Sequence, residues 1–92
     1  MQQAKPGRAI PIALNPRPEI EIEAAPVAAA LGLDVETFLT LLAQRKIDQL
    51  CERGTGDDAG LYRASYYYRH VRARVVVDQQ GRMQGEVERR GR

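Results

Sequence analysis

The alternation of apolar and polar side chains is sharpest between Leu61 and Asp78. If the chain turns at Arg69 and His70, it forms two antiparallel strands whose alternate side chains share a face. One face then carries apolar or small side chains: Tyr62, Ala64, Tyr66, Tyr68, Val71, Ala73, Val75 and Val77. The other carries mostly polar side chains: Arg63, Ser65, Tyr67, Arg72, Arg74 and Val76. A shift of one residue would mix the two sets, so the pattern predicts this register.

Two conformations of the turn are compatible with that register. A two-residue turn would consist of Arg69 and His70, although this pair is not favoured in such turns. A four-residue loop over residues 68–71 would place the same residues opposite one another. A second turn is predicted at residues 78–82, DQQGR, from its composition.

The segment before the hairpin predicts one strand and two helices. Glu19–Glu23, EIEIE, alternates strictly and predicts a half-buried strand. Ala24–Leu31 predicts a short helix that ends at Gly32. Asp34 is placed to cap a second helix that runs to about Arg45. Helical spacing defines the buried face of that second helix, at Val35, Phe38, Leu39 and Leu42.

These elements together predict a single α+β domain over residues 19–82. Residues 47–53 predict another strand, and the glycines and aspartates of residues 54–60 predict a loop. The predicted chain order is strand, helix, helix, strand, strand, strand. We therefore expect a small antiparallel sheet of four strands with a two-helix hairpin packed on one face.

The two ends of the chain predict little regular structure. Residues 1–18 hold four of the five prolines, which favours a flexible leader. A short edge strand within residues 9–14 is the alternative, although Pro11 argues against a long one. Residues 83–92 predict a charged tail, with a short last strand around Met83 and Val87 as the alternative.

Composition restricts the environment and the class of partner. The net charge of +2 is only mildly basic, so nucleic acid is permitted as a partner but not implied. The single cysteine excludes an internal disulfide, and no apolar stretch reaches the length of a membrane span. We expect a cytoplasmic protein without membrane contact. A core of about 60 to 70 ordered residues is marginal alone, which favours a homodimer.

The polar face of the hairpin is the first candidate binding surface. Its members Arg63, Tyr67, Arg72 and Arg74 combine charge with an aromatic ring, as surfaces that bind proteins or single-stranded RNA do. An alternative is that these arginines form cross-strand pairs with Glu19, Glu21 and Glu23, if that strand lies beside the hairpin. We favour this pairing over binding of RNA.

The helical pair is the second candidate, because it is weakly similar to winged helix-turn-helix proteins. A small residue in the first helix, Gly32 in the turn and apolar residues within the second helix carry the similarity. The DNA contacts would then be Thr37, Thr40, Gln44, Arg45, Lys46 and Arg69. However, Asp34 and Glu36 in the first turn would repel phosphate, which disfavours this hypothesis.

No motif in the sequence predicts catalysis, a cofactor or a metal. Cys51 and His70 are the only residues of their kinds, so neither a resolving cysteine nor a metal-ligand set exists within the chain. The segment 54–58, GTGDD, lacks the lysine and the strand-to-helix setting of a phosphate-binding loop. A thiol-dependent role for Cys51 is the third and least favoured hypothesis.

Several segments resemble an uncharacterised family of small bacterial proteins, a domain of unknown function. They are LGLD at 31–34, LCERGTGDDAGLYR at 50–63, YYY at 66–68 and VVVD at 75–78, with Gly81 and Arg82. The resemblance covers about residues 19–82 and implies a compact cytoplasmic domain. It brings no activity and no catalytic residue. We therefore expect a non-enzymatic binding or regulatory module, with a protein partner or a second copy favoured over DNA.

Overall fold

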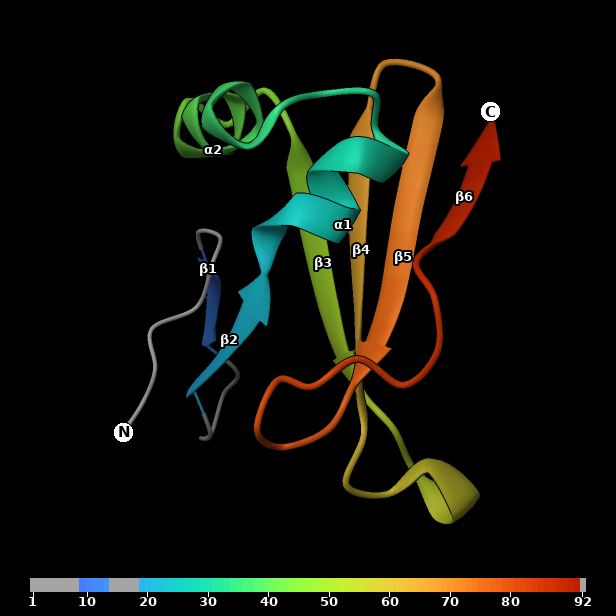
Figure 1. Ribbon diagram of the computed structural model, residues 1–92. Helices are drawn as coiled ribbons and strands as arrows, with labels where there is room; N and C mark the ends of the chain where they lie inside the picture. The colour runs from blue at the N-terminus through green and yellow to red at the C-terminus, as the bar shows by residue number, and fades with distance from the viewer. Residues whose placement is uncertain (1–8, 14–18, 92) are drawn as a thin grey trace.

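The computed structural model describes residues 9–13 and 19–91, which form two antiparallel sheets and two α-helices (Figure 1). The elements in chain order are β1 Ala9–Ala13, β2 Glu19–Glu23, α1 Ala24–Ala30, α2 Val35–Ala43, β3 Asp48–Arg53, the 3-10 turn η1 Gly56–Asp58, β4 Tyr62–Tyr68, β5 Val71–Val77 and β6 Glu88–Gly91. The first sheet pairs β1 with β2, and the second has the strand order β3-β4-β5-β6. The predicted α+β class is confirmed.

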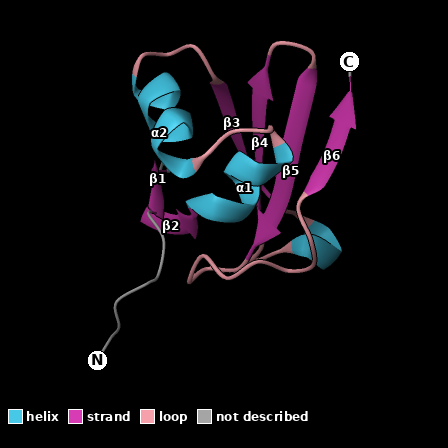
Figure 2. Ribbon diagram, turned by 45° about the horizontal axis from the view of Figure 1, so that its top comes forward, coloured by secondary structure: helices cyan, strands magenta, loops and turns pink. Residues whose placement is uncertain are grey.

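The elements form two layers, with the four-stranded sheet as one of them. Both helices and the β1–β2 hairpin lie on the same side of this sheet (Figures 1 and 2). Within the described chain, no helix or strand covers the opposite side. We call the covered side the inner face and the uncovered side the outer face.

The predicted hairpin register is confirmed across its whole length. Tyr68 opposes Val71, Tyr66 opposes Ala73 and Tyr62 opposes Val77. The strands end at Tyr68 and resume at Val71, so the two-residue turn forms rather than the longer loop. Arg69 adopts a left-handed conformation with φ of 56°, which two-residue hairpin turns require at their first position.

The two helices form where local signals place them. Gly32 has φ of 77° just beyond α1, a conformation that ends the helix at little cost only for glycine. The Asp34 carboxylate accepts a hydrogen bond of 2.7 Å from the backbone N–H of Thr37. This bond lowers the pKa of Asp34 and caps α2. No single helix in the described ranges is long and apolar enough to cross a bilayer.

The predicted strand order is wrong in one respect. Glu19–Glu23 does not join the sheet of the hairpin but pairs with Ala9–Ala13, so the chain order begins with two strands. Pro11 is tolerated there because each strand of a two-stranded sheet has a free edge, where a missing N–H leaves no bond unmade. The fourth strand of the large sheet is instead β6, from the segment predicted to be a tail.

Strands therefore form at both ends of the chain. The edge-strand alternative describes residues 9–13, whereas residues 1–8 and 14–18 of the predicted leader lie outside the described residues. Met83 forms only an isolated bridge with Val77, and the last strand begins five residues later, at Glu88. Arg89 of this strand donates a hydrogen bond of 2.9 Å from Nε to the carbonyl oxygen of Ala30, which joins β6 to the end of α1.

The core lies between the inner face and the layer that covers it. Isoleucines from β1 and β2, small residues from α1 and alternate residues of β4 and β5 fill it. At its centre, the rings of Phe38 and Tyr66 meet edge to face, with centroids 5.8 Å apart. Both side chains are fully buried. Of the face predicted for α2, Phe38 contacts the inner face of the sheet, whereas Val35, Leu39 and Leu42 are only partly buried against the core.

The hydroxyl of Tyr66 is buried and has no hydrogen-bond partner among the described residues. Burial raises its pKa, so the group stays protonated. We expect Tyr66→Phe to raise the free energy of unfolding by about 1 kcal/mol, because an unpaired buried hydroxyl is costly. Urea denaturation followed by circular dichroism measures this. Tyr62→Phe is the control, expected to change little, and a clear loss of stability in Tyr66→Phe would contradict the prediction.

The side chain of Asp78 holds the loop after β5 in place. The Asp78 carboxylate accepts hydrogen bonds from the backbone N–H groups of Gln80 and Arg82 and from the Arg82 guanidinium. These bonds lower its pKa. They hold a tight turn in which Gly81 packs directly against the backbone carbonyl of Glu21. The predicted turn at residues 78–82 therefore also joins the two sheets.

Candidate interaction face

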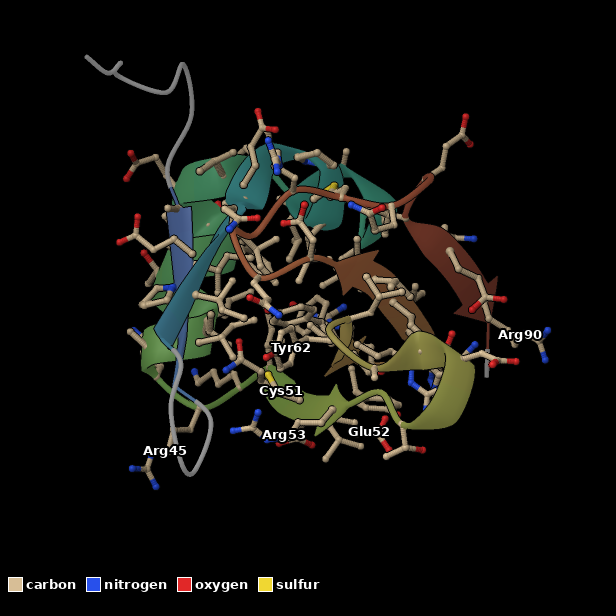
Figure 3. All side chains as sticks on the ribbon, turned by 90° about the horizontal axis from the view of Figure 1, so that it is seen from below. Arg45, Cys51, Glu52, Arg53, Tyr62 and Arg90 are labelled. Atoms are coloured by element: carbon tan, nitrogen blue, oxygen red, sulfur yellow. The ribbon has the colours of Figure 1, made fainter. Side chains whose placement is uncertain are left out.

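The outer face brings together all four residues predicted for the first binding surface. Residues directly opposite one another in antiparallel strands point to the same side, so the pairing of the strands identifies its members. The outer face carries Asp48, Leu50 and Glu52 from β3, Arg63, Ser65 and Tyr67 from β4, Arg72, Arg74 and Val76 from β5, and Glu88 and Arg90 from β6. Figure 3 shows Glu52 and Arg90 on this side of the sheet.

Two of its arginines form ion pairs with glutamates of the neighbouring strands. Arg63 lies 2.9 Å from Glu52, and Arg72 lies 3.3 Å from Glu88. Cross-strand pairing of the arginines was expected, but with Glu19, Glu21 and Glu23 as the partners. That expectation is wrong because the strand of those glutamates belongs to the other sheet.

Arg72 and Arg74 are held more firmly than a surface position implies. The Arg72 side chain is only 17% exposed, and its Nε is buried without a partner among the described residues. Arg74 donates a hydrogen bond of 3.0 Å from Nε to the hydroxyl of Ser65, which is itself fully buried. A preformed conformation lowers the entropy that an arginine loses when it binds a partner.

The outer face also carries apolar surface. Leu50 is 48% exposed, the one large hydrophobic side chain in the described ranges that is strongly exposed. Val76 is half-buried. Tyr67 is half-buried as well and lies between Asp48 and Arg72 in the sheet.

Sequence reasoning missed five members of the outer face. Leu50, Asp48 and Glu52 come from β3, where the weak alternation hid the face to which each residue points. The three residues alternate along the strand, at positions 48, 50 and 52, and this spacing is the feature of the sequence that could have placed them on one face. Glu88 and Arg90 come from β6, which no apolar periodicity marked.

The residues predicted to contact DNA lie at one end of the molecule. Thr37 and Thr40 lie on α2, and Gln44, Arg45 and Lys46 follow it, while Arg69 lies in the β4–β5 turn (Figure 1). All six side chains are exposed. The axes of α1 and α2 differ in direction by 89°. Arg69 contacts the ring of Tyr68, with its guanidinium carbon 5.2 Å from the centroid.

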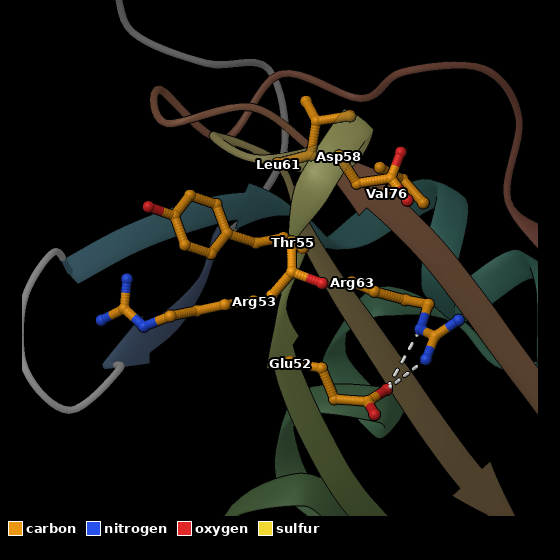
Figure 4. Close-up of a pocket in the computed structure, with 9 residues that line it drawn as sticks. Glu52, Arg53, Thr55, Asp58, Leu61, Arg63 and Val76 are labelled. Atoms are coloured by element: carbon orange, nitrogen blue, oxygen red, sulfur yellow. Dashed lines mark hydrogen bonds and ion pairs between the residues drawn. The ribbon is translucent and has the colours of Figure 1, made fainter.

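A cleft of about 270 Å³ lies at the other end of the four-stranded sheet, beside the loop that joins β3 to β4 (Figure 4). Its lining includes Glu52, Arg53, Gly54, Thr55, Asp58, Leu61, Tyr62, Arg63 and Val76. The Arg63–Glu52 pair lies within it, and the guanidinium carbon of Arg53 is 5.7 Å from the centroid of the Tyr62 ring. Two carboxylates and two guanidinium groups balance one another, so the cleft selects neither anions nor cations.

Cys51 and His70 lie far apart. Cys51 opposes Ala64 in the middle of β4, whereas His70 lies six residues beyond Ala64 at the turn, roughly 20 Å away along an extended strand. Burial raises the pKa of the Cys51 thiol, and the negative charge of Glu52 raises it further. The reactive thiolate is therefore disfavoured. Within the described part of the chain, no three His, Cys, Asp or Glu side chains are grouped to hold a metal ion.

Comparison with known proteins places the chain in a family but assigns it no activity. Searches of curated proteins and of solved structures found no match. The model of one family matches residues 11–88, a range that includes most of β1 and reaches the first residue of β6. The chain therefore belongs to the family of unknown function DUF6522.

Proposed function

We propose that this protein is a non-enzymatic interaction module of the cytoplasm that binds a protein partner through its outer face. The observation that carries the proposal is the uncovered side of the four-stranded sheet, where Leu50 is 48% exposed. An apolar side chain exposed on the face of a sheet, with charged groups around it, is typical of a protein-binding surface.

The composition of the outer face supports a protein partner. Tyrosine and arginine contribute most often to binding energy at protein interfaces, and Tyr67, Arg72 and Arg74 lie on adjacent strands there. The ion pairs of Arg63 and Arg72 with glutamates reduce the positive charge that RNA phosphates would require. These pairs favour protein over single-stranded RNA as the partner.

The remaining chemistry of the chain supports a module without catalysis. A nucleophile needs an activating base within hydrogen-bond reach. Cys51, whose thiol pKa is raised, lies far along the sheet from His70. In the cleft beside the β3–β4 loop, the carboxylate of Glu52 is already paired with Arg63.

DNA binding by the helical pair is the second candidate, and one observation favours it. The 89° between α1 and α2 is close to the angle between the helices of a helix-turn-helix. Against it, Glu36 lies exposed in the first turn of α2, where a recognition helix meets DNA. Arg45 and Lys46 follow the helix and are not on its contact face.

Substitution of Tyr67 tests the proposed function. We expect Tyr67→Ala to reduce capture of the partner at least about tenfold, the loss typical of an interface hot spot. The immobilised protein would capture partners from extracts of its source organism, and mass spectrometry would quantify them. Asp57→Ala is the control, because Asp57 is exposed in η1, outside the four strands that form the outer face. A partner retained equally by both variants would contradict the proposal.

An amide NMR titration separates the two candidates. The protein would be titrated with a mixed-sequence DNA duplex and with a single-stranded RNA, at low and then moderate salt. We expect no salt-sensitive shifts along residues 34–46. If such shifts appear and the double variant Arg45→Ala, Lys46→Ala abolishes them, DNA binding is the function. Salt-sensitive shifts of residues 63–74 with the RNA would instead identify the outer face as an RNA-binding surface.

A further inference from the structure

We infer that the partner of the outer face is a second copy of this chain. The two copies are related by a twofold axis that lies between their outer faces, parallel to the strands and above the boundary of β4 and β5. This inference rests on the proposed function, because it names the partner of the same surface. The inference is based on one row of residues that crosses the four strands on the outer face: Asp48, Tyr67, Arg72 and Arg90.

The row spans the whole width of the sheet. Asp48 opposes Tyr67, Tyr67 opposes Arg72, and Arg72 opposes Arg90. Its ends therefore lie on the two edge strands, β3 and β6. With neighbouring strands about 4.8 Å apart, the ends of the row are roughly 14 Å from each other.

The two end residues carry opposite charges that the rest of the described chain leaves unpaired. Asp48 and Arg90 are both exposed, and neither side chain forms an ion pair with another described residue. By contrast, the other charged side chains of the outer face are engaged in ion pairs or, for Arg74, in a hydrogen bond. Among the described residues, the face therefore has one negative charge without an ion-pair partner at one edge and one such positive charge at the other.

A twofold axis along the strands makes this row complementary to itself. The rotation places β3 over β6 of the second copy and β4 over β5, which is the aligned packing of two sheets in a sandwich. Asp48 then faces Arg90 of the partner subunit, and the same contact repeats on the other side of the axis. Tyr67 faces Arg72 of the partner subunit, where its ring can meet the guanidinium group.

The size of the outer face predicts a weak dimer. The strands β3, β4, β5 and β6 have six, seven, seven and four residues, which gives a flat area of at most roughly 20 by 20 Å. This is smaller than the roughly 800 Å² per partner of a standard stable interface. The dimer is therefore expected to dissociate on dilution, so its population is measured over a range of concentrations.

The decisive experiment uses two charge-reversal variants of the full chain. Asp48→Arg places like charges at both end contacts, and so does Arg90→Asp, so each variant alone is expected to dimerise at least about tenfold more weakly. Mixed in equal amounts, the two variants have opposite charges at both contacts. The mixture should recover dimerisation to within about threefold of the original chain. Sedimentation velocity measures each sample, and circular dichroism shows that every variant is folded. Asp57→Arg is the control, because it reverses an exposed charge in η1, outside the strands of the outer face.

The outcomes separate this inference from the proposed function. Single variants that dimerise like the original chain, or a mixture that does not recover, would overturn the twofold arrangement. A chain that stays monomeric up to millimolar concentration would overturn the inference as a whole. If Tyr67→Ala still abolishes capture of a different protein in that case, the proposed function stands and only the identity of the partner is wrong.

Discussion

Replacing Gly81 with alanine is expected to lower the free energy of unfolding by at least about 3 kcal/mol. Gly81 has φ of 83°, a conformation that strains any residue with a Cβ. A Cβ at this position would also overlap the carbonyl oxygen of Glu21, so either the 78–82 turn or β2 must move. Because this contact joins the loop to the β1–β2 hairpin, its loss should loosen the packing between the two sheets.

Gly85→Ala provides the matched control for this prediction. Gly85 has a similar φ of 92°, but nothing lies within 4 Å of a Cβ built there. Its substitution therefore carries the backbone strain alone, expected to cost about 1 kcal/mol. Urea denaturation of both variants, followed by circular dichroism, separates strain from steric overlap. Equal losses in the two variants would show that the contact with Glu21 contributes nothing.

Phe38→Ala is expected to destabilise the protein by about 3 to 5 kcal/mol, the usual cost of removing a buried phenylalanine. Phe38 is fully buried, and it is the only buried residue of α2. Its ring contacts Tyr66 edge to face, and no other aromatic pair occupies the core of the described chain. The cavity left by alanine would therefore lie between α2 and the inner face of the sheet.

Thermal and urea denaturation measure this effect, with Thr40→Ala on the same helix as the control. Thr40 is exposed, so its substitution should change the stability by less than about 0.5 kcal/mol. Because a loss of this size is a large fraction of the stability of so small a domain, Phe38→Leu supplies an intermediate variant with a smaller cavity. A loss below about 1 kcal/mol in Phe38→Ala would contradict the central place of this ring in the core.

The hairpin illustrates what alternation along a chain can predict. Successive side chains of a strand point to opposite faces, so Tyr62, Tyr66 and Val75 share a side in this register, and a shift of one residue would divide them between the two faces. The ends of the helices can be predicted for the same reason, because they depend on residues close by in the sequence. The Asp34 cap and the positive φ of Gly32 depend on residues within one turn, and both form where expected.

The partners of the strands were not predictable in the same way. Glu19–Glu23 alternates strictly whichever strand lies beside it, and its pattern is satisfied by pairing with Ala9–Ala13. The strand Glu88–Gly91 has no buried apolar alternation, because all four of its residues are exposed at the edge of the sheet. Its position depends on backbone hydrogen bonds to β5 and on the bond from Arg89 to Ala30. Neither interaction can be predicted from the pattern of apolar residues.

The outer face was likewise predicted in part from local alternation and determined in part by the tertiary structure. Alternation alone placed Arg63, Tyr67, Arg72 and Arg74 on one side of a hairpin, because the period of a strand is local. Tertiary structure decided that both helices cover the other side and that Glu52 and Glu88 pair with two of the arginines. It also left Asp48 and Arg90, at opposite edges, without an ion pair to another described residue. Those outcomes depend on which strands become neighbours, and contacts between residues far apart in the chain settle that choice.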